Sequence, residues 1–305
     1  MTAKEAWKRL DISIKEICLD TVLPSGQSFK WKRLDSEWIS VLGDSVVILK
    51  QSPEHIHFRA LPEANTALVG PVLLDYFNHS ISLTNLHRKF AARDAHFRAI
   101  AADFSGIRML RQDPWETLVS FICSANNNIK RIETMIANLA RTFGTFVASY
   151  GDTDFFTFPP PAALTDPAVV RQLRDLGFGY RAPYIHATAV QAQAWLELGN
   201  QFSQLRGQPY PDVREFLLRF QGVGPKVADC VCLMAFDCHD AVPIDTHMWN
   251  IIQRRYAFKS KIRNSSKAKT LSKAMYDEIG DYLRSLWGNY AGWAQAVIFI
   301  SELRK

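Results

Sequence analysis

The chain has 305 residues, 48% of them hydrophobic, which is enough to form one large domain or two smaller ones around a real core. No apolar run is long enough to span a membrane and the N-terminal segment lacks the apolar core of a secretion signal, so we expect no membrane association. The net charge of +6 is compatible with nucleic-acid binding without establishing it, and five irregularly spaced cysteines favour a reducing compartment over a disulfide framework.

The N-terminal part of the chain has the pattern of an antiparallel β-meander. Short segments that mix apolar and polar positions are separated by turn residues, and they lie at residues 28–33, 37–42, 45–50 and 55–60. From about residue 84 the spacing of apolar residues becomes helical. The sequence therefore predicts an α+β chain, in which an N-terminal antiparallel β domain (residues 1–84) packs on a larger all-helical domain (residues 85–305).

Several helix boundaries can be located in the second part. Asp113 and Pro114 are suited to cap and begin a helix, and the polar stretch 124–128 separates it from a second helix that stops at Gly144. Further helices are expected around residues 213–220, from Pro225, from Asp245, and around Trp287 and Trp293. The basic segment 259–270 is predicted to be an exposed loop.

The segment 217–247 carries most of the functional signal. Gly222-Val223-Gly224 forms a turn between two predicted helices, and glycines at a helix N-terminus let backbone N–H groups approach an anion closely. That anion would be a DNA phosphate, because the loop lacks the Gly-Lys-Ser/Thr ending of a nucleotide-binding loop. An ordinary helix–turn–helix corner explains the glycines equally well.

Lys226 shifts the balance toward chemistry. It lies in the first turn of a predicted helix, where the helix dipole disfavours a positive charge, and apolar residues follow it. Both effects favour the neutral amine that nucleophilic attack requires, although a solvated lysine is the commoner reason for a lysine at a helix start.

Asp245 lies 19 positions further on, and two interpretations of it are possible. It can cap the helix that follows, and it can also accept a proton or stabilise a positive charge that develops on a sugar. The two roles are compatible. Cys230 and Cys232, by contrast, lie two residues apart on one helix and point to nearly opposite sides, so we reject a metal site.

Five segments resemble the 8-oxoguanine DNA glycosylases of the helix-hairpin-helix superfamily, in the order of that family. The central one, FQGVGPKVADCVCLMAFD…AVPIDTHMW, is similar to the family's helix-hairpin-helix signature. The others are LPSGQSFKW (23–31), RQDPWETLVSFICSANNNIKRI (111–132), LGFGYRAPYI (176–185) and LWGNYAGWAQAVIF (286–299).

The resemblance implies a role for individual residues. Lys226 would attack the sugar C1′ and form a Schiff base, and Asp245 would be the catalytic carboxylate. In the pocket for the flipped base, the Gly26 carbonyl would recognise the oxidised base. Of Gln295 and Phe299, one would bond the Watson–Crick edge and the other would stack on the base. Cys230 would form the opposite wall, and Met234 would also line the pocket. The terminal helix would thus complete the pocket, although Phe299 could also be plain core.

The resemblance also implies a set of DNA contacts. Residues that recognise the cytosine left behind would be Asn126, Arg131 and Arg181, with Tyr180 as a wedge beside it. Backbone phosphates would be bound at Gly222, Gly224 and His247. Without the resemblance, Asn126 could simply cap the next helix, and the neighbours Tyr180 and Arg181 are a common pairing in loops.

We therefore expect a bifunctional DNA glycosylase and AP lyase of base excision repair that excises 8-oxoguanine opposite cytosine, followed by β-elimination. It would need no metal or redox cofactor, would bind double-stranded DNA as a monomer, and would act in the nucleus, with mitochondria as a second possible location. A relative acting on another lesion and a non-catalytic DNA-binding module are the competing hypotheses. Lys226 and Asp245 together with a base pocket disfavour the second.

Overall fold

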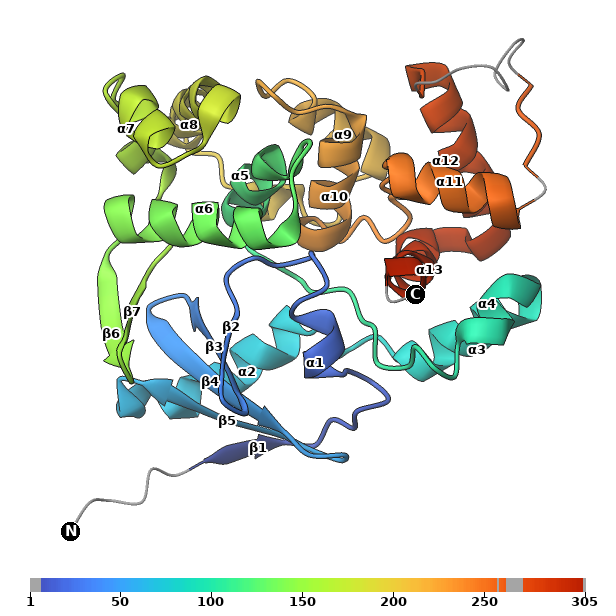
Figure 1. Ribbon diagram of the computed structural model, residues 1–305, viewed down its shortest axis with the longest axis horizontal. Coiled ribbons are helices and arrows are strands. Elements are labelled where there is room, and N and C mark those ends of the chain that lie inside the picture. The colour runs from blue at the N-terminus through green and yellow to red at the C-terminus, as the bar shows by residue number, and fades with distance from the viewer. Residues whose placement is uncertain (1–6, 257, 262–270, 304–305) are drawn as a thin grey trace.

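The computed structural model describes residues 7–256, 258–261 and 271–303 of the chain, and Figure 1 shows a β-sheet at lower left with a helical body above and to its right. The sheet has five antiparallel strands in the order β1-β5-β4-β3-β2. These strands are β1 (Lys8–Leu10), β2 (Lys32–Leu34), β3 (Glu37–Leu42), β4 (Ser45–Gln51) and β5 (Ile56–Leu61). The predicted α+β architecture with an N-terminal antiparallel sheet is confirmed.

Two strands differ from the expectation. In place of the predicted strand 28–33 the structure has β2 at Lys32–Leu34. Just before that segment the chain is bonded elsewhere, since Gln27 donates to the carbonyl of Arg108 (3.1 Å) and accepts from the amide of Leu110 (3.1 Å). The short strand β1 was not anticipated. It pairs with β5, almost fifty residues away along the chain, and its own three residues carry too little pattern to predict it.

The body is formed by helices. The α-helices in the described part of the chain are α1 (Leu19–Val22), α2 (Thr66–Tyr76), α3 (Leu83–Arg93), α4 (Ala95–Ile100), α5 (Pro114–Ser124), α6 (Ile129–Phe143), α7 (Val169–Asp175), α8 (Ala182–Glu197), α9 (Tyr210–Leu217), α10 (Pro225–Ala235), α11 (Thr246–Arg255), α12 (Lys273–Trp287) and α13 (Ala291–Leu303). Short 3₁₀ turns are η1 (Glu63–Asn65), η2 (Pro161–Leu164), η3 (Gly179–Arg181), η4 (Phe202–Leu205) and η6 (Gly288–Tyr290).

The capping residues explain where several helices begin. The Asp113 carboxylate accepts from the amide of Glu116 (2.8 Å) at the start of α5, as predicted. Asn128, not Asn126, caps α6 by accepting from the amide of Arg131 (3.0 Å), so the capping alternative for Asn126 is wrong. These side chains satisfy amides that have no partner inside the helix.

The helical domain also contains a β-hairpin, so the prediction of an all-helical body missed one element. Strands β6 (Phe146–Tyr150) and β7 (Thr153–Phe156) pair with each other and lie against the sheet, where Phe155 packs with Ile39 and Ile48. Tyr150 accepts from Arg59 (2.7 Å) and donates to Glu37. The hairpin therefore covers the face of the sheet opposite to that covered by α2.

A buried ion pair joins the segment before β2 to the helical body. Lys30 Nζ lies 2.7 Å from Glu116 Oε2 on α5. The predicted basic loop 259–270 lies mostly outside the described residues, which stop at 261 and resume at 271. Within the described part of the chain, no helix has both the length and the apolar character to cross a membrane.

Candidate active site

One pocket is lined by all seven residues predicted for catalysis or base binding. These are Gly26, Lys226, Cys230, Met234, Asp245, Gln295 and Phe299, and they come from the segment before β2, from α10, from the α10–α11 connection and from α13. The wall also contains residues that the sequence did not single out, namely Ser25, Gln27, Phe121, Pro243, Ala296 and Ile300. Nothing in the sequence distinguishes such wall residues from ordinary core.

Lys226 lies in the first turn of α10 and is half-buried at the pocket. Its Nζ donates to Ser124 Oγ at 3.2 Å and lies 5.1 Å from the centroid of the Phe121 ring. A hydroxyl and an aromatic face therefore hold the amine at the pocket, and no carboxylate among the described residues pairs with it.

Asp245 is the N-cap of α11 and also lines the pocket. Its Oδ1 accepts from the amide of Met248 at 2.8 Å, which fixes the orientation of the carboxylate. The capping role and a place at the pocket thus coexist, as the sequence allowed.

Cys230 follows Lys226 by one helical turn and is almost fully buried. Burial raises the pKa of its thiol to about 11, and the nearby charge of Lys226 offsets this only in part. The side chain is therefore a neutral thiol at physiological pH and not a thiolate nucleophile. No group of three or more His, Cys, Asp or Glu side chains able to hold a metal occurs in the part of the chain that the structure describes.

Gly26 is held in a conformation that suits glycine. Its φ is +84°, and a Cβ placed there would lie 3.2 Å from Cδ1 of Ile129. The next residue is fixed on both sides, because Gln112 Nε2 donates to the Gln27 carbonyl (2.7 Å) in addition to the contacts of the Gln27 side chain. The backbone at this edge of the pocket is therefore rigid.

Gln295 and Phe299 lie one helical turn apart on α13. Gln295 is only 6% exposed, yet within the described residues its amide has no hydrogen-bond partner and it lines the pocket. The side-chain amide is accessible from the pocket, so its donor and its acceptor are available to a ligand bound there. The half-buried Phe299 ring lies 6.5 Å from the ring of His247, which is exposed at the start of α11.

The two glycines of the turn before α10, Gly222 and Gly224, differ in what the fold requires of them. Gly222 has φ of +81°, and a Cβ there would come within 2.8 Å of Tyr184. Gly224, the N-cap of α10, has an ordinary φ of −98°, and a Cβ there would meet nothing within 4 Å. The fold therefore requires glycine at position 222, whereas at 224 it leaves open space beside a helix N-terminus.

The residues predicted to contact the opposite strand gather at the turn between α5 and α6. Asn126 is exposed with φ of +48°, and the exposed Arg131 donates to the carbonyl of Gly177 (3.2 Å). Tyr180 is 53% exposed and its hydroxyl donates to the Ala125 carbonyl (3.0 Å). Arg181 differs from the others because it is only 2% exposed. Its guanidinium donates to the carbonyls of Ala125 and Asn126 and so stabilises the turn from the interior side.

Family comparison defines the class of protein. Residues 9–118 match the 8-oxoguanine DNA glycosylase N-terminal domain, and residues 119–276 match the HhH-GPD superfamily of base excision DNA repair proteins. The chain therefore belongs to the HhH-GPD superfamily, in the branch of the 8-oxoguanine DNA glycosylases. Within it, the protein is a DNA N-glycosylase with DNA-lyase activity, as the sequence predicted.

Individual relatives cover nearly the whole chain. The N-glycosylase/DNA lyase of Saccharomyces cerevisiae is 37% identical over 97% of this chain and 86% of its own length. The N-glycosylase/DNA lyase OGG1 of Arabidopsis thaliana is 34% identical over 99% of this chain and 82% of its own. The solved structure of MBOgg1 in complex with a low-affinity DNA ligand is similar with a TM-score of 0.82 at 29% identity, covering 99% of this chain and 98% of that one.

Proposed function

We propose that this glycosylase excises 8-oxoguanine opposite cytosine and that Lys226 is its nucleophile. The observation that carries the proposal is that Lys226, the rigid Gly26 backbone and the unpartnered Gln295 amide line one pocket. A base extruded from the duplex into this pocket would present its glycosidic bond to the lysine and its polar edge to the amide.

The chemistry of the lesion fits the Gly26 backbone. Oxidation at C8 converts N7 of guanine from an acceptor into an N–H donor. A carbonyl beside that position gives the donor a partner and repels the lone pair of normal guanine. A mismatched buried polar group costs about 1–3 kcal/mol, so this contact contributes one step of a larger selection.

The reaction would proceed through a covalent intermediate. The neutral amine of Lys226 forms a bond to C1′ while the bond from C1′ to the base breaks, and the departing base takes a proton from the nitrogen that has attacked. Opening of the sugar breaks the C1′–O4′ bond, O4′ takes a proton from solvent, and a protonated Schiff base remains. Loss of a C2′ proton to solvent then breaks the C3′–O bond and expels the 3′ phosphate. Asp245 would stabilise the positive charge that develops on the sugar as the base departs. No step requires a metal or redox cofactor.

DNA would be held from two sides of the pocket. Amides of the Gly222–Gly224 turn, at the N-terminus of α10, and the exposed His247 would bind phosphates of the strand that carries the lesion. Asn126, Arg131 and Tyr180 would contact the cytosine left in the other strand, over a turn held by Arg181. Cytosine offers two acceptors and one donor, which arginine and an asparagine carbonyl complement.

We further propose a monomer that acts on nuclear DNA, with mitochondrial DNA as an additional substrate. All five cysteines are free, which fits a reducing compartment. Size-exclusion chromatography with light scattering tests the first statement and microscopy of the tagged chain in a eukaryotic cell tests the second.

A panel of duplexes tests the substrate. Excision would be measured under single-turnover conditions on 8-oxoguanine opposite each of the four bases, on an alkylated purine, and on undamaged DNA. We expect the fastest release of base from the 8-oxoguanine:cytosine duplex. Faster excision of the alkylated purine would contradict the proposal, and binding without excision of any lesion would support the DNA-binding module instead.

A further inference from the structure

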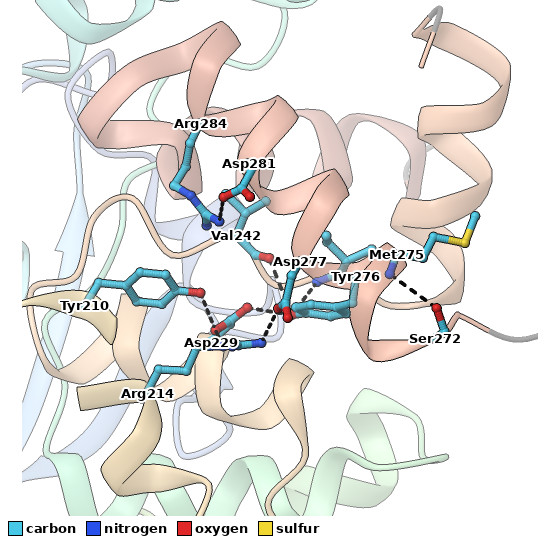
Figure 2. A network of polar contacts seen from close by, with 11 residues as sticks. Tyr210, Arg214, Asp229, Val242, Ser272, Met275, Tyr276, Asp277, Asp281 and Arg284 are labelled. Atoms are coloured by element: carbon cyan, nitrogen blue, oxygen red, sulfur yellow. Dashed lines mark hydrogen bonds and ion pairs between the residues drawn. The ribbon is translucent and has the colours of Figure 1, made fainter. Parts of the chain in front are cut away.

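The helix that carries Lys226 also carries a buried carboxylate that faces away from the pocket. Asp229, on α10, is 1% exposed and lies three residues after Lys226. Figure 2 shows it between α9 and α12, where Oδ1 accepts from the Tyr210 hydroxyl (2.8 Å) and from Arg214 Nε (3.0 Å), while Oδ2 accepts from the Tyr276 hydroxyl (2.7 Å). A buried carboxylate with this many donors is an anchor point of the fold.

Tyr276 extends the network to the segment that ends in Asp245. Its hydroxyl accepts from the amide of Ile244 at 3.2 Å. The hydroxyl has one hydrogen, and the Asp229 oxygen at 2.7 Å is a closer acceptor than the Val242 carbonyl at 3.5 Å. The hydrogen bonds therefore run in one direction, from the Ile244 amide to the phenol and from the phenol to the carboxylate.

The segment held in this way is irregular and immediately precedes Asp245. Residues 241–245 form neither helix nor strand, so no regular hydrogen-bond ladder fixes them. The Ile244 amide is the neighbour of the residue that caps α11 and lines the pocket. Chains of this kind strengthen one another in a low-dielectric interior, and removal of the hydroxyl would leave the buried amide without its acceptor.

We propose that Asp229 and Tyr276 are positioning residues, which set the Asp245 carboxylate relative to Lys226 by tying the helix of the lysine to the backbone of Ile244. Neither residue lines the pocket, so neither touches the substrate. This inference rests on the proposed roles of Lys226 and Asp245. It explains why a buried charge is retained on α10, next to an apolar core that could have accommodated a neutral side chain.

The chain offers a matched pair of variants for the test. Tyr276→Phe removes one hydroxyl bond to Asp229 and also the acceptor of the Ile244 amide. Tyr210→Phe removes a hydroxyl bond of the same kind and similar length to the other oxygen of the same carboxylate, and leaves Ile244 untouched. Both variants should therefore lose stability, whereas only Tyr276→Phe should shift the Asp245 carboxylate.

For both variants the single-turnover excision rate at saturating enzyme, the Kd for an uncleaved duplex and the melting temperature would be measured on the full chain. We expect the excision rate of Tyr276→Phe to fall about tenfold, because misplacement of a catalytic group by a fraction of an ångström has effects of this size. The Kd of Tyr276→Phe should stay within about twofold of the wild-type value. The excision rate of Tyr210→Phe should also stay within about twofold of wild type, and the two variants should have comparable melting temperatures.

A second comparison shows whether the effect passes through Asp245. In an Asp245→Asn background the further change Tyr276→Phe should alter the rate by less than about twofold, since the group being positioned is already disabled. Equal rate losses in Tyr276→Phe and Tyr210→Phe, or a full tenfold loss in the Asp245→Asn background, would overturn the inference. An inactive wild-type enzyme on 8-oxoguanine:cytosine would instead refute the proposed function.

Discussion

The base pocket and the surface at the α5–α6 turn are built in different ways. Pocket residues come from distant parts of the chain, namely residues 25–27, α5, residues 226–245 and α13, and hydrogen bonds to other segments hold them, as at Gln27 and Lys226. On the turn surface Asn126, Arg131 and Tyr180 are exposed, and the side chains of Arg131 and Tyr180 donate to backbone carbonyls of adjacent segments. Under the proposed function, the pocket would be preorganised for chemistry on one base, whereas the surface would contact a DNA strand that must be able to leave.

Substitutions in the pocket and on the turn surface should therefore have different effects. Changes in the pocket should lower the rate of excision with little effect on DNA affinity, because the pocket acts on the transition state. Changes on the turn surface should alter affinity and the preference for the opposite base.

The largest effect is expected at Asp245, where capping and catalysis can be separated. Asp245→Asn keeps an oxygen that accepts from the Met248 amide, so the free energy of unfolding should change little while excision falls about 100-fold. Asp245→Ala should in addition lose about 1 kcal/mol of stability. Thermal unfolding and single-turnover excision check the two parts, and a fully active Asp245→Asn would reduce Asp245 to a cap.

Substitution of Gly222 and Gly224, in the turn before α10, should give the next largest effects. One substitution should affect stability and the other should affect DNA affinity. Gly222→Ala should lower the stability by about 2 kcal/mol, because φ of +81° disfavours a side chain and Tyr184 blocks the Cβ. Gly224→Ala should leave stability unchanged and weaken DNA affinity about tenfold, because its Cβ would occupy the space of a phosphate. Unchanged affinity in Gly224→Ala would mean that no DNA backbone approaches this turn.

At the turn surface, Arg131→Gln should weaken the preference for cytosine over adenine in the opposite strand about fivefold, since it removes charged donors to the acceptors of cytosine. The measurement is the ratio of excision rates from the two duplexes. Arg171→Gln, at an exposed position on α7, is the control and should keep the wild-type ratio. A ratio that is the same in all three proteins would remove Arg131 from opposite-base recognition.

The smallest effect concerns Cys230. Because burial raises the pKa of its thiol to about 11, the neutral form persists at pH 7 and the reactive thiolate accumulates only as the pH approaches that value. Iodoacetamide labelling followed by mass spectrometry should therefore show slow modification of Cys230 at pH 7 to 8 and faster modification toward pH 10. Rapid labelling at pH 7 would contradict the buried neutral thiol.

The sequence predicted what depends on local signals. Asp113 and Asp245 cap helices because their side chains satisfy the amides that follow directly, and this pattern is readable without a structure. The strands β1, β6 and β7 were missed, since each is short and is stabilised by partners outside its own segment.

At the site, the residue pattern from Gly222 to Asp245 predicted the candidate catalytic residues. Gly26 and Gln295, by contrast, were identified only through the family resemblance. The link between Asp229 and Tyr276 joins residues 47 apart through a tertiary contact, for which the sequence has no local signature.

The most direct test of the central claim is borohydride trapping with a duplex that carries 8-oxoguanine opposite cytosine. The wild type, Lys226→Gln and an undamaged duplex would be compared on denaturing gels. We expect a covalent protein–DNA adduct that requires both the lesion and Lys226, while Lys226→Gln still binds the duplex. Release of free base without any adduct, or an adduct that persists in Lys226→Gln, would contradict the assignment of Lys226 as the nucleophile.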